Sequence, residues 1–276
     1  MGWIILLFGG VVMNLKRDTY AIVDLDHLKY NVELAHSEFK RPLMAVIKAD
    51  AYGHGYKEVA SFLKDIDYIE MFAVATLQEA IELRELGIDK GILILGAIPT
   101  SKEDIDLAIK YDISLTMVSV AYLKLLDHLI DEGQTLKVHI KLDTGMHRIG
   151  LMSKEELSTL LRLVNPDKFN VEGIFTHFAT ADGDDVAFEK QRSLFYEMVG
   201  NCKFKYIHCC NSAAMTYHRD EKSNMGRLGI TMYGCSPNGE EETKFKQVMS
   251  LYTKVAMIKK IPAGDKVGFN LYCKRR

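Results

Sequence analysis

The stretch PLMAVIKA, residues 42–49, is an almost continuous apolar run that ends near a lysine. Such a run is typical of a parallel strand that is buried on both faces. Amphipathic segments such as 77–86 and 119–133 separate it from further β-rich runs. These runs occupy residues 71–76, 91–96, 114–118, 137–144, 170–178, 205–212 and 227–234. Eight strands joined by crossovers predict a closed (β/α)8 barrel of the TIM type. An open doubly wound sheet is the alternative, but no run is followed by its GxGxxG signature.

Two details of the helical segments are also predicted. In 119–133, four apolar residues are predicted to fall on one face of an amphipathic helix. Those residues are Ala121, Leu125, Leu126 and Leu129. Ser101 followed by Asp104 predicts a helix N-cap with an acidic first turn.

The two ends of the chain depart from the barrel pattern. Residues 14–25 contain a strand, TYAIVDL, that precedes a helix at about 26–39. Residues 247–258 alternate without helices, which indicates β structure. We therefore expect residues 26–238 to form the barrel and residues 239–276 to begin an incomplete β domain. The strand in 14–25 is expected to pair with that domain.

Residues 1–13 are interpreted as an extension outside the fold. The apolar run 3–13 is shorter than the roughly 20 residues that cross a bilayer. It also lacks the basic start and small-residue end of a signal peptide. Two origins remain open: translation upstream of a natural start at Met13, or the last part of a membrane helix from a longer parent protein.

The overall composition is that of a soluble globular protein. The 276 residues are 48% hydrophobic and 26% charged, with a net charge of −2. No basic field exists to attract nucleic acid or an anionic membrane, so neither partner is expected. The five cysteines are odd in number and contain no CxxC pair, which favours the cytoplasm over an oxidising compartment. Cys209 and Cys210 follow His208, but adjacent strand residues point to opposite faces, so we expect no metal.

Function in such a barrel gathers where the strands end at their carboxyl side. Lys48 ends the first strand, and burial of its amine would make it a nucleophile for an aldehyde. Arg148, in KLDTGMHRIG, has the fork that binds a carboxylate, although an ion pair with Asp143 is an alternative. His177 ends a strand as either a site residue or a core histidine. Other candidates at strand ends are Lys141, Asn211, Ser212, Arg227 and Gly229.

Five segments, in order, resemble the motifs of alanine racemases and related amino-acid racemases. They are AVIKADAYGHG, KLDTGMHRIG, THFATAD, HCCNSAAM and GRLGITMYG, and the resemblance covers about residues 19–268. It implies a (β/α)8 barrel followed by a β domain, pyridoxal 5′-phosphate as cofactor, a small amino acid as substrate and a homodimer.

The resemblance also implies roles for single residues. Lys48 is the catalytic lysine that forms the Schiff base with the cofactor and acts as one of two bases. Arg148 is implied to place the substrate carboxylate, and Lys141 resembles the lysine that is often carbamylated in the family. The remaining cofactor-binding positions are Tyr52, His177, Asn211, Ser212, Arg227, Gly229 and Ile230.

One departure from the family concerns the second base. The family places a tyrosine after an AG(D/E)xV turn, whereas this chain reads AGDKVGFN and has Phe269 there. Tyr272 is an odd number of residues away and would face the other side of a strand. The expectation is therefore an alanine racemase whose activity is impaired. The alternatives are a non-enzymatic pyridoxal-phosphate carrier, or the catalytic module of a membrane-bound serine racemase.

Overall fold

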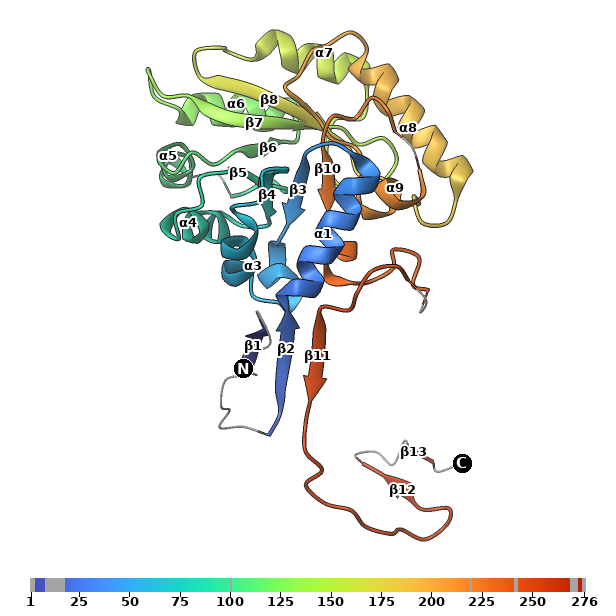
Figure 1. Cartoon of the computed structure of the whole chain (residues 1–276). Coiled ribbons are helices and arrows are strands. Elements are labelled where there is room, and N and C mark those ends of the chain that lie inside the picture. Colours follow the sequence, from blue (N-terminus) through green and yellow to red (C-terminus); the bar gives the residue numbers. More distant parts are fainter. Residues whose placement is uncertain are drawn as a thin grey trace.

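The computed structural model describes residues 3–7, 18–99, 101–218, 220–240, 243–268 and 273–274. Within this part of the chain, eight strands run parallel to one another around a barrel (Figure 1). They are β3 (Leu43–Val46), β4 (Ile69–Val74), β5 (Gly91–Ile94), β6 (Leu115–Met117), β7 (Leu136–Lys141), β8 (Phe169–Phe175), β9 (Tyr206–Ile207) and β10 (Gly226–Leu228).

The barrel closes through two short joins. The strands form two four-stranded ladders, β10-β3-β4-β5 and β6-β7-β8-β9. A parallel bridge between Leu93 and Ser114 connects β5 to β6. On the other side, the Arg227 N–H donates to the Cys210 carbonyl at 2.9 Å and so connects β10 to the segment after β9. The predicted (β/α)8 barrel is confirmed.

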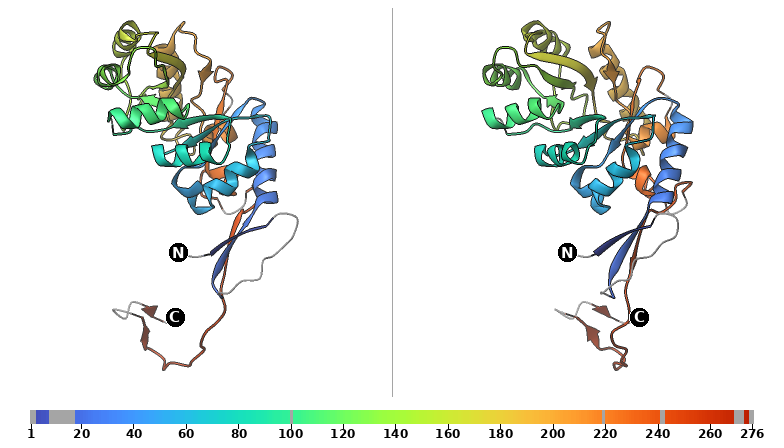
Figure 2. Two further views of the ribbon diagram at one scale, coloured as in Figure 1. Left: turned by 90° about the vertical axis from the view of Figure 1, so that its left-hand side faces the viewer. Right: turned by 60° about the vertical axis from the view of Figure 1, so that its left-hand side comes forward.

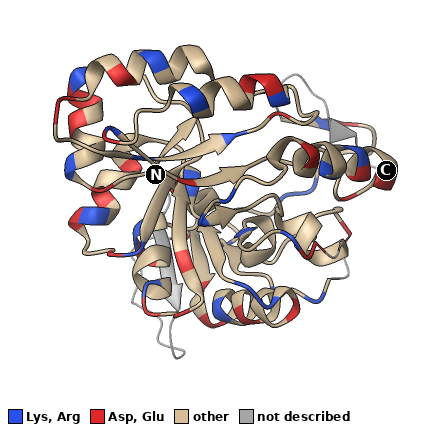
Figure 3. Cartoon of the chain, turned by 90° about the horizontal axis from the view of Figure 1, so that it is seen from above, with Lys and Arg blue, Asp and Glu red and all other residues tan. Residues whose placement is uncertain are grey.

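Helices cover the outside of the barrel, as the views in Figure 2 show. Their bounds are α1 (Leu25–Phe39), α3 (Tyr56–Leu63), α4 (Leu77–Glu85), α5 (Lys102–Lys110), α6 (Val120–Leu129), α7 (Lys154–Leu163), α8 (Asp185–Val199) and α9 (Ser212–Tyr217). The Ser101 cap is confirmed, because its side chain accepts from the Asp104 N–H in a capping box. Acidic and basic residues are interspersed over these helices (Figure 3).

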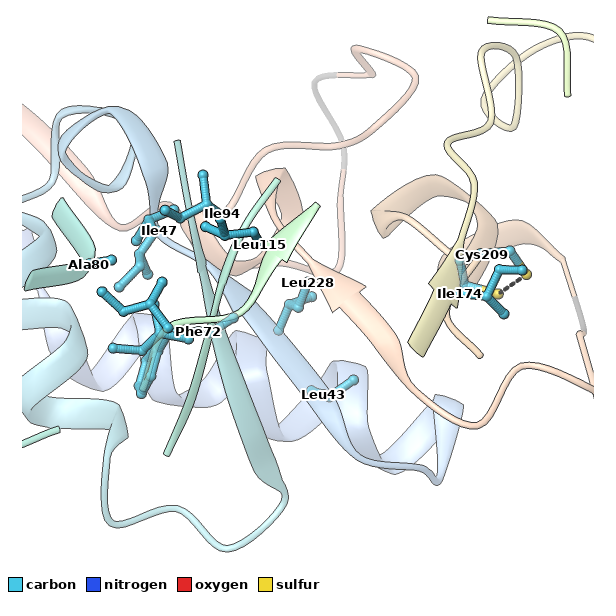
Figure 4. Packing of buried hydrophobic residues seen from close by; sticks show 14 of the residues in the cluster. Leu43, Ile47, Phe72, Ala80, Ile94, Leu115, Ile174, Cys209 and Leu228 are labelled. Atoms are coloured by element: carbon cyan, nitrogen blue, oxygen red, sulfur yellow. Dashed lines mark hydrogen bonds between the residues drawn. The ribbon is translucent and has the colours of Figure 1, made fainter. Parts of the chain in front are cut away.

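Strand residues alternate between two apolar layers, as the pleat requires. Leu43, Ala45 and Ile47 belong to the large cluster between strands and helices, part of which Figure 4 shows. Met44 and Val46 belong to a smaller cluster that also holds Met71, Ala73, Leu93 and Met225. Lys48 comes two residues after Val46, beyond the end of β3, and both residues line the cavity at this end of the barrel.

Three predicted details are wrong. The runs 205–212 and 227–234 contain much shorter strands than expected. Asn211 caps helix α9 by accepting from the Ala214 N–H, which ends the extended backbone. After Gly229 the chain turns into a 3-10 helix, η1 (Ile230–Tyr233). In α6, the inward face carries Leu123 and Leu126, whereas Leu125 is exposed, so the predicted face of that helix is also corrected.

A separate three-stranded sheet projects from the barrel (Figures 1 and 2). Its central strand, β2 (Tyr20–Asp24), pairs antiparallel with β11 (Met249–Tyr252). Strand β1 (Trp3–Leu7) pairs parallel with the other edge of β2. The expectation that residues 1–13 take no part in the fold is thus wrong for residues 3–7, because this apolar run can fill an open strand edge.

Beyond β11, strands β12 (Lys266–Val267) and β13 (Cys273–Lys274) pair antiparallel. Phe269 and Tyr272, on which the prediction about the second base depends, lie outside the described residues. Among the helices that are described, none combines the length and apolar character needed to cross a membrane.

Candidate active site

A cavity of about 550 Å³ opens at the carboxyl ends of the barrel strands. The ends of seven of the eight strands, all but β6, contribute to its wall, as expected for a parallel barrel. The structure brings all ten predicted site residues together in this wall. They are Lys48, Tyr52, Lys141, Arg148, His177, Asn211, Ser212, Arg227, Gly229 and Ile230.

Lys48 begins an unusual turn, α2 (Lys48–Gly53), which no pattern in the sequence predicts. The four residues from Ala49 to Tyr52 all have left-handed torsions, with φ between 51° and 55°. A left-handed residue other than glycine costs roughly 1–2 kcal/mol, so this turn stores strain beside the lysine. The Ala49 N–H donates to Glu79 Oε1 at 2.9 Å, which helps to hold the turn.

The environment of Lys48 favours its neutral amine. Partial burial lowers the pKa of Lys48, and the positive charge of Arg148 lowers this pKa further, while Glu79 opposes both. A neutral amine is the form that attacks a carbonyl carbon and accepts a proton. Lys48 is thus suited to both steps.

Two hydroxyl groups and a glycine form one corner of the cavity. The Gly229 N–H donates to Ser212 Oγ at 3.0 Å. A Cβ placed on Gly229 would lie 3.6 Å from the Tyr52 hydroxyl and 3.7 Å from Ser212 Oγ. The missing side chain therefore leaves room between these hydroxyls. Such a corner, bounded by O–H and backbone N–H donors, fits a phosphate group.

Arg227 is buried at the floor of the cavity. Its guanidinium donates to the Thr176 carbonyl at 2.7 Å, to the Cys209 carbonyl at 3.3 Å and to the His208 carbonyl. Burial lowers the pKa of Arg227 to about 10, so the side chain stays cationic at neutral pH. It can therefore donate a hydrogen bond into the cavity without giving up its proton.

His177 lies beside this arginine, with Nδ1 at 3.4 Å from the Arg227 guanidinium. Because a guanidinium only donates, Nδ1 must accept, and the proton of the neutral ring resides on Nε2. Burial lowers the pKa of His177 to about 3, and the charges of Arg227 and Arg148 contribute. His177 is thus a neutral site residue rather than an isolated core histidine.

The loop after β7 is built around Asp143. Its carboxylate accepts the backbone N–H groups of Gly145, His147 and Arg148 at 3.1, 2.9 and 2.8 Å. Within the described residues, Asp143 thus takes the backbone rather than the guanidinium of Arg148 as its partner. The Arg148 side chain remains in the cavity wall, where it can bind a carboxylate.

Lys141 reaches the same cavity from the end of β7. Its amine donates to the Leu142 carbonyl at 2.6 Å. Burial lowers the pKa of Lys141 to about 8, helped by Arg227 and Arg148 and opposed by Asp143. A larger share of the amine is therefore neutral near neutral pH than in an ordinary lysine, and only a neutral amine adds carbon dioxide. This environment fits the carbamylation that the sequence resemblance implies.

Some cavity residues were not predicted. Met146, Phe175, Phe178 and Asp182 also line the wall. The Phe175 ring packs under Arg227, with the guanidinium carbon 5.4 Å from the ring centre. All four lie in or next to the strand-end segments quoted above. Their position at the strand ends is therefore the signal in the sequence that could have identified them.

Fold and site together define a (β/α)8 barrel protein whose carboxyl-end cavity combines a lysine of lowered pKa with a phosphate-sized corner and a cationic floor. The family model "Alanine racemase, N-terminal domain" matches residues 23–237. An alanine racemase of Lactococcus lactis subsp. lactis is 40% identical over 262 residues, which are 92% of this chain and 70% of the relative.

Solved structures agree with this match. The alanine racemase from E. faecalis has a TM-score of 0.85 at 35% identity, covering 95% of this chain and 73% of the other. The alanine racemase from Bacillus anthracis, solved with bound L-Ala-P, has a TM-score of 0.81 at 36% identity, covering 95% and 70%. The chain belongs to the alanine racemase family.

Proposed function

We propose that this protein interconverts L- and D-alanine with pyridoxal 5′-phosphate as its cofactor. The observation that carries the proposal is the single cavity in which Lys48 and nine other motif residues meet. The names of its relatives, alanine racemases, support alanine as the substrate.

The residues present fit this cofactor. Lys48 would hold it covalently through Nζ, and the corner of Tyr52, Ser212, Gly229 and Ile230 would hold its phosphate. Arg227 would donate to the ring nitrogen, with His177 and Asn211 lining the ring. When bound, pyridoxal phosphate withdraws electrons from the attached amino acid and so acidifies its Cα–H.

The chain's own side chains account for orientation and proton transfer. Arg148 binds the substrate carboxylate, and Lys141 lies in the same wall to orient it. Lys48 Nζ, whose pKa is lowered mainly by burial, takes the Cα proton on one face and can return it there. Arg227 remains cationic and therefore does not hand a proton to the ring nitrogen, which limits side reactions.

The proposal extends to the assembly. We propose a homodimer that acts in the cytoplasm, in which residues 26–238 bind the cofactor and residues 239–276 belong to a β domain. The antiparallel pairing of β2 with β11 beyond the barrel supports that division. Free cysteines among the described residues support a reducing compartment.

The test is borohydride reduction of the protein with cofactor, followed by peptide mapping. We expect one adduct, on Lys48, which Lys48→Ala removes and the exposed-residue control Lys154→Ala retains. An adduct on another lysine, or none at saturating cofactor, would show the proposal to be wrong. Mass spectrometry of L-alanine and L-serine incubated in D₂O then separates the two substrates, and we expect deuterium exchange at the Cα–H of alanine.

A further inference from the structure

Two adjacent cysteines lie together outside the active-site cavity. Cys209 and Cys210 are fully buried, and their sulfur atoms are 4.0 Å apart; Figure 4 marks this contact at Cys209 with a dashed line. The expectation that they point to opposite faces is wrong. Strand alternation no longer applies to them, because β9 ends at Ile207.

A buried carboxylate faces this pair. Asp220 is 5% exposed, and its Oδ1 accepts from the Tyr196 hydroxyl at 2.6 Å. The same oxygen accepts the N–H groups of Lys222 and Ser223 at 3.0 and 2.9 Å. The other oxygen, Oδ2, lies 3.4 Å from Cys209 Sγ. One oxygen therefore fixes the carboxylate while the other is directed at the sulfur.

The spacing is that of a tetrahedral metal site. Two sulfurs at about 2.3 Å and one oxygen at about 2.1 Å from a zinc ion would be separated by about 3.8 Å (S–S) and about 3.6 Å (S–O). The protein has 4.0 and 3.4 Å between the corresponding atoms. All three ligand atoms of Cys209, Cys210 and Asp220 lie within 4.8 Å of one another.

A second cavity borders the cluster. It has a volume of about 630 Å³, and Tyr196 of α8 and Asp220 are among the residues that line it. The Tyr196 hydroxyl lies 3.3 Å from Cys209 Sγ. Asp220 therefore connects the buried cysteines to this cavity.

We propose that Cys209, Cys210 and Asp220 form a binding site for a thiophilic divalent cation with a filled d shell, such as Zn²⁺. Binding forms two metal–sulfur bonds and one metal–oxygen bond. Both thiol protons pass to solvent, and water molecules leave the ion, with no change of oxidation state. The fixed Asp220 carboxylate supplies the orientation that metal ligands need from their neighbours.

The site is linked to the floor of the active-site cavity. Arg227 donates its backbone N–H to the Cys210 carbonyl at 2.9 Å and its guanidinium to the Cys209 carbonyl at 3.3 Å. A bound ion would therefore immobilise the segment from which Arg227 is held. The positive charge of Arg227 also offsets the net negative charge that two thiolates, a carboxylate and a divalent ion carry together.

The experiment uses the full chain with Cys202, Cys235 and Cys273 replaced by serine, kept reduced. Titration with Cd²⁺ is followed through the ultraviolet thiolate-to-cadmium charge-transfer band. We expect saturation at one equivalent, displacement by Zn²⁺ and a higher Tm with either ion. Cys209→Ser abolishes the band, and Asp220→Asn weakens Cd²⁺ binding at least about tenfold, the equivalent of one lost charged ligand.

Glu221→Gln is the matched control, since it removes a charge from the same cavity but leaves the cluster intact, and it should bind Cd²⁺ like the parent. Because Asp220 also organises its loop, a second measurement covers a folding failure of its variant. In the parent, Cd²⁺ should protect both thiols from alkylation, as read by mass spectrometry. No saturable band at one equivalent, an equal band in Cys209→Ser, or unprotected thiols would overturn the proposal.

Discussion

The backbone N–H of Gly229 donates to the hydroxyl of Ser212 at 3.0 Å, which joins the end of β10 to the first turn of α9. This bond closes one side of the corner that we assign to the cofactor phosphate. Both partners come from neighbouring strand ends, so the corner depends on closure of the barrel.

Gly229→Ala tests that corner. The added methyl would lie 3.6 Å from the Tyr52 hydroxyl and 3.7 Å from Ser212 Oγ, which are ordinary contacts. We expect cofactor affinity to fall at least about tenfold, because the methyl fills the space for the phosphate. Fluorescence titration with pyridoxal phosphate measures it. Gly183→Ala, where a Cβ meets open space, is the control. Equal affinities in both variants would contradict the assignment.

Arg148→Lys tests the substrate role of the arginine. Lysine keeps the charge but loses the planar fork that grips a carboxylate at two points. We expect KM for L-alanine to rise about tenfold, because roughly one charge-assisted hydrogen bond to the carboxylate is lost. Cofactor affinity should stay unchanged. Steady-state kinetics beside the exposed control Arg162→Lys gives the comparison. A change in Tm without a change in KM would instead make Arg148 a structural residue.

The lowered pKa of His177 predicts acid sensitivity. The folded pKa of His177 is about 3, below the usual histidine pKa of about 6.5. Between these values the unfolded chain binds one more proton than the folded chain, so stability falls as pH decreases from 6.5 towards 3. At pH 5 the loss is about 2 kcal/mol.

Urea unfolding across this window is the measurement. His177→Gln should flatten the acid limb by about one proton, whereas the exposed His128→Gln should not. The prediction fails if both variants keep the slope of the parent. His139, whose pKa burial also lowers to about 3, keeps part of the slope in every variant.

Ala49→Gly tests the strain in the left-handed turn after Lys48. Ala49 has φ 51° and is exposed, so glycine removes a steric cost of roughly 1–2 kcal/mol without losing buried surface. The extra backbone entropy of glycine costs about 0.5–1 kcal/mol, and we expect a net gain or no change in stability. Ala121→Gly, exposed in right-handed α6, should instead lose about 0.5–1 kcal/mol. Denaturant unfolding of both variants gives the answer, and equal losses would argue against strain at residue 49.

Phe269 predicts weak racemisation. Phenylalanine has no exchangeable proton, and loss of a positioned acid or base typically lowers a rate by about 10²–10⁴. In D₂O we expect Lys48 to exchange the Cα–H of L-alanine on one face while optical purity is kept. Phe269→Tyr should raise D-alanine formation, and Phe269→Leu serves as its control. Racemisation by the parent near 10 s⁻¹, a typical enzyme rate, would show that another group supplies the second proton.

The barrel could be predicted because strands buried on both faces leave long apolar runs. The shared cavity followed, since the carboxyl ends of parallel strands converge. The apolar patterns around Asn211 and Gly229 predict strands that are too long. Helix capping and a backbone turn end β9 and β10, and neither is visible as a change in hydrophobicity. Two features could not be predicted from the sequence: the left-handed torsions at Ala49, and the contact between Cys209 and Asp220. They depend on backbone angles and on packing between segments, which periodicity does not encode.

The antiparallel partner of β2 also sets a condition for biosynthesis. Val23 pairs with Met249, so one edge of β2 stays unpaired during synthesis until the whole barrel has been made. At about 5–20 residues per second, that delay is roughly 10–50 seconds. Strand β1 is synthesised before β2 and can shield its other edge from the start. The open edge is where a nascent chain would need a chaperone, or would pair with a neighbouring chain instead.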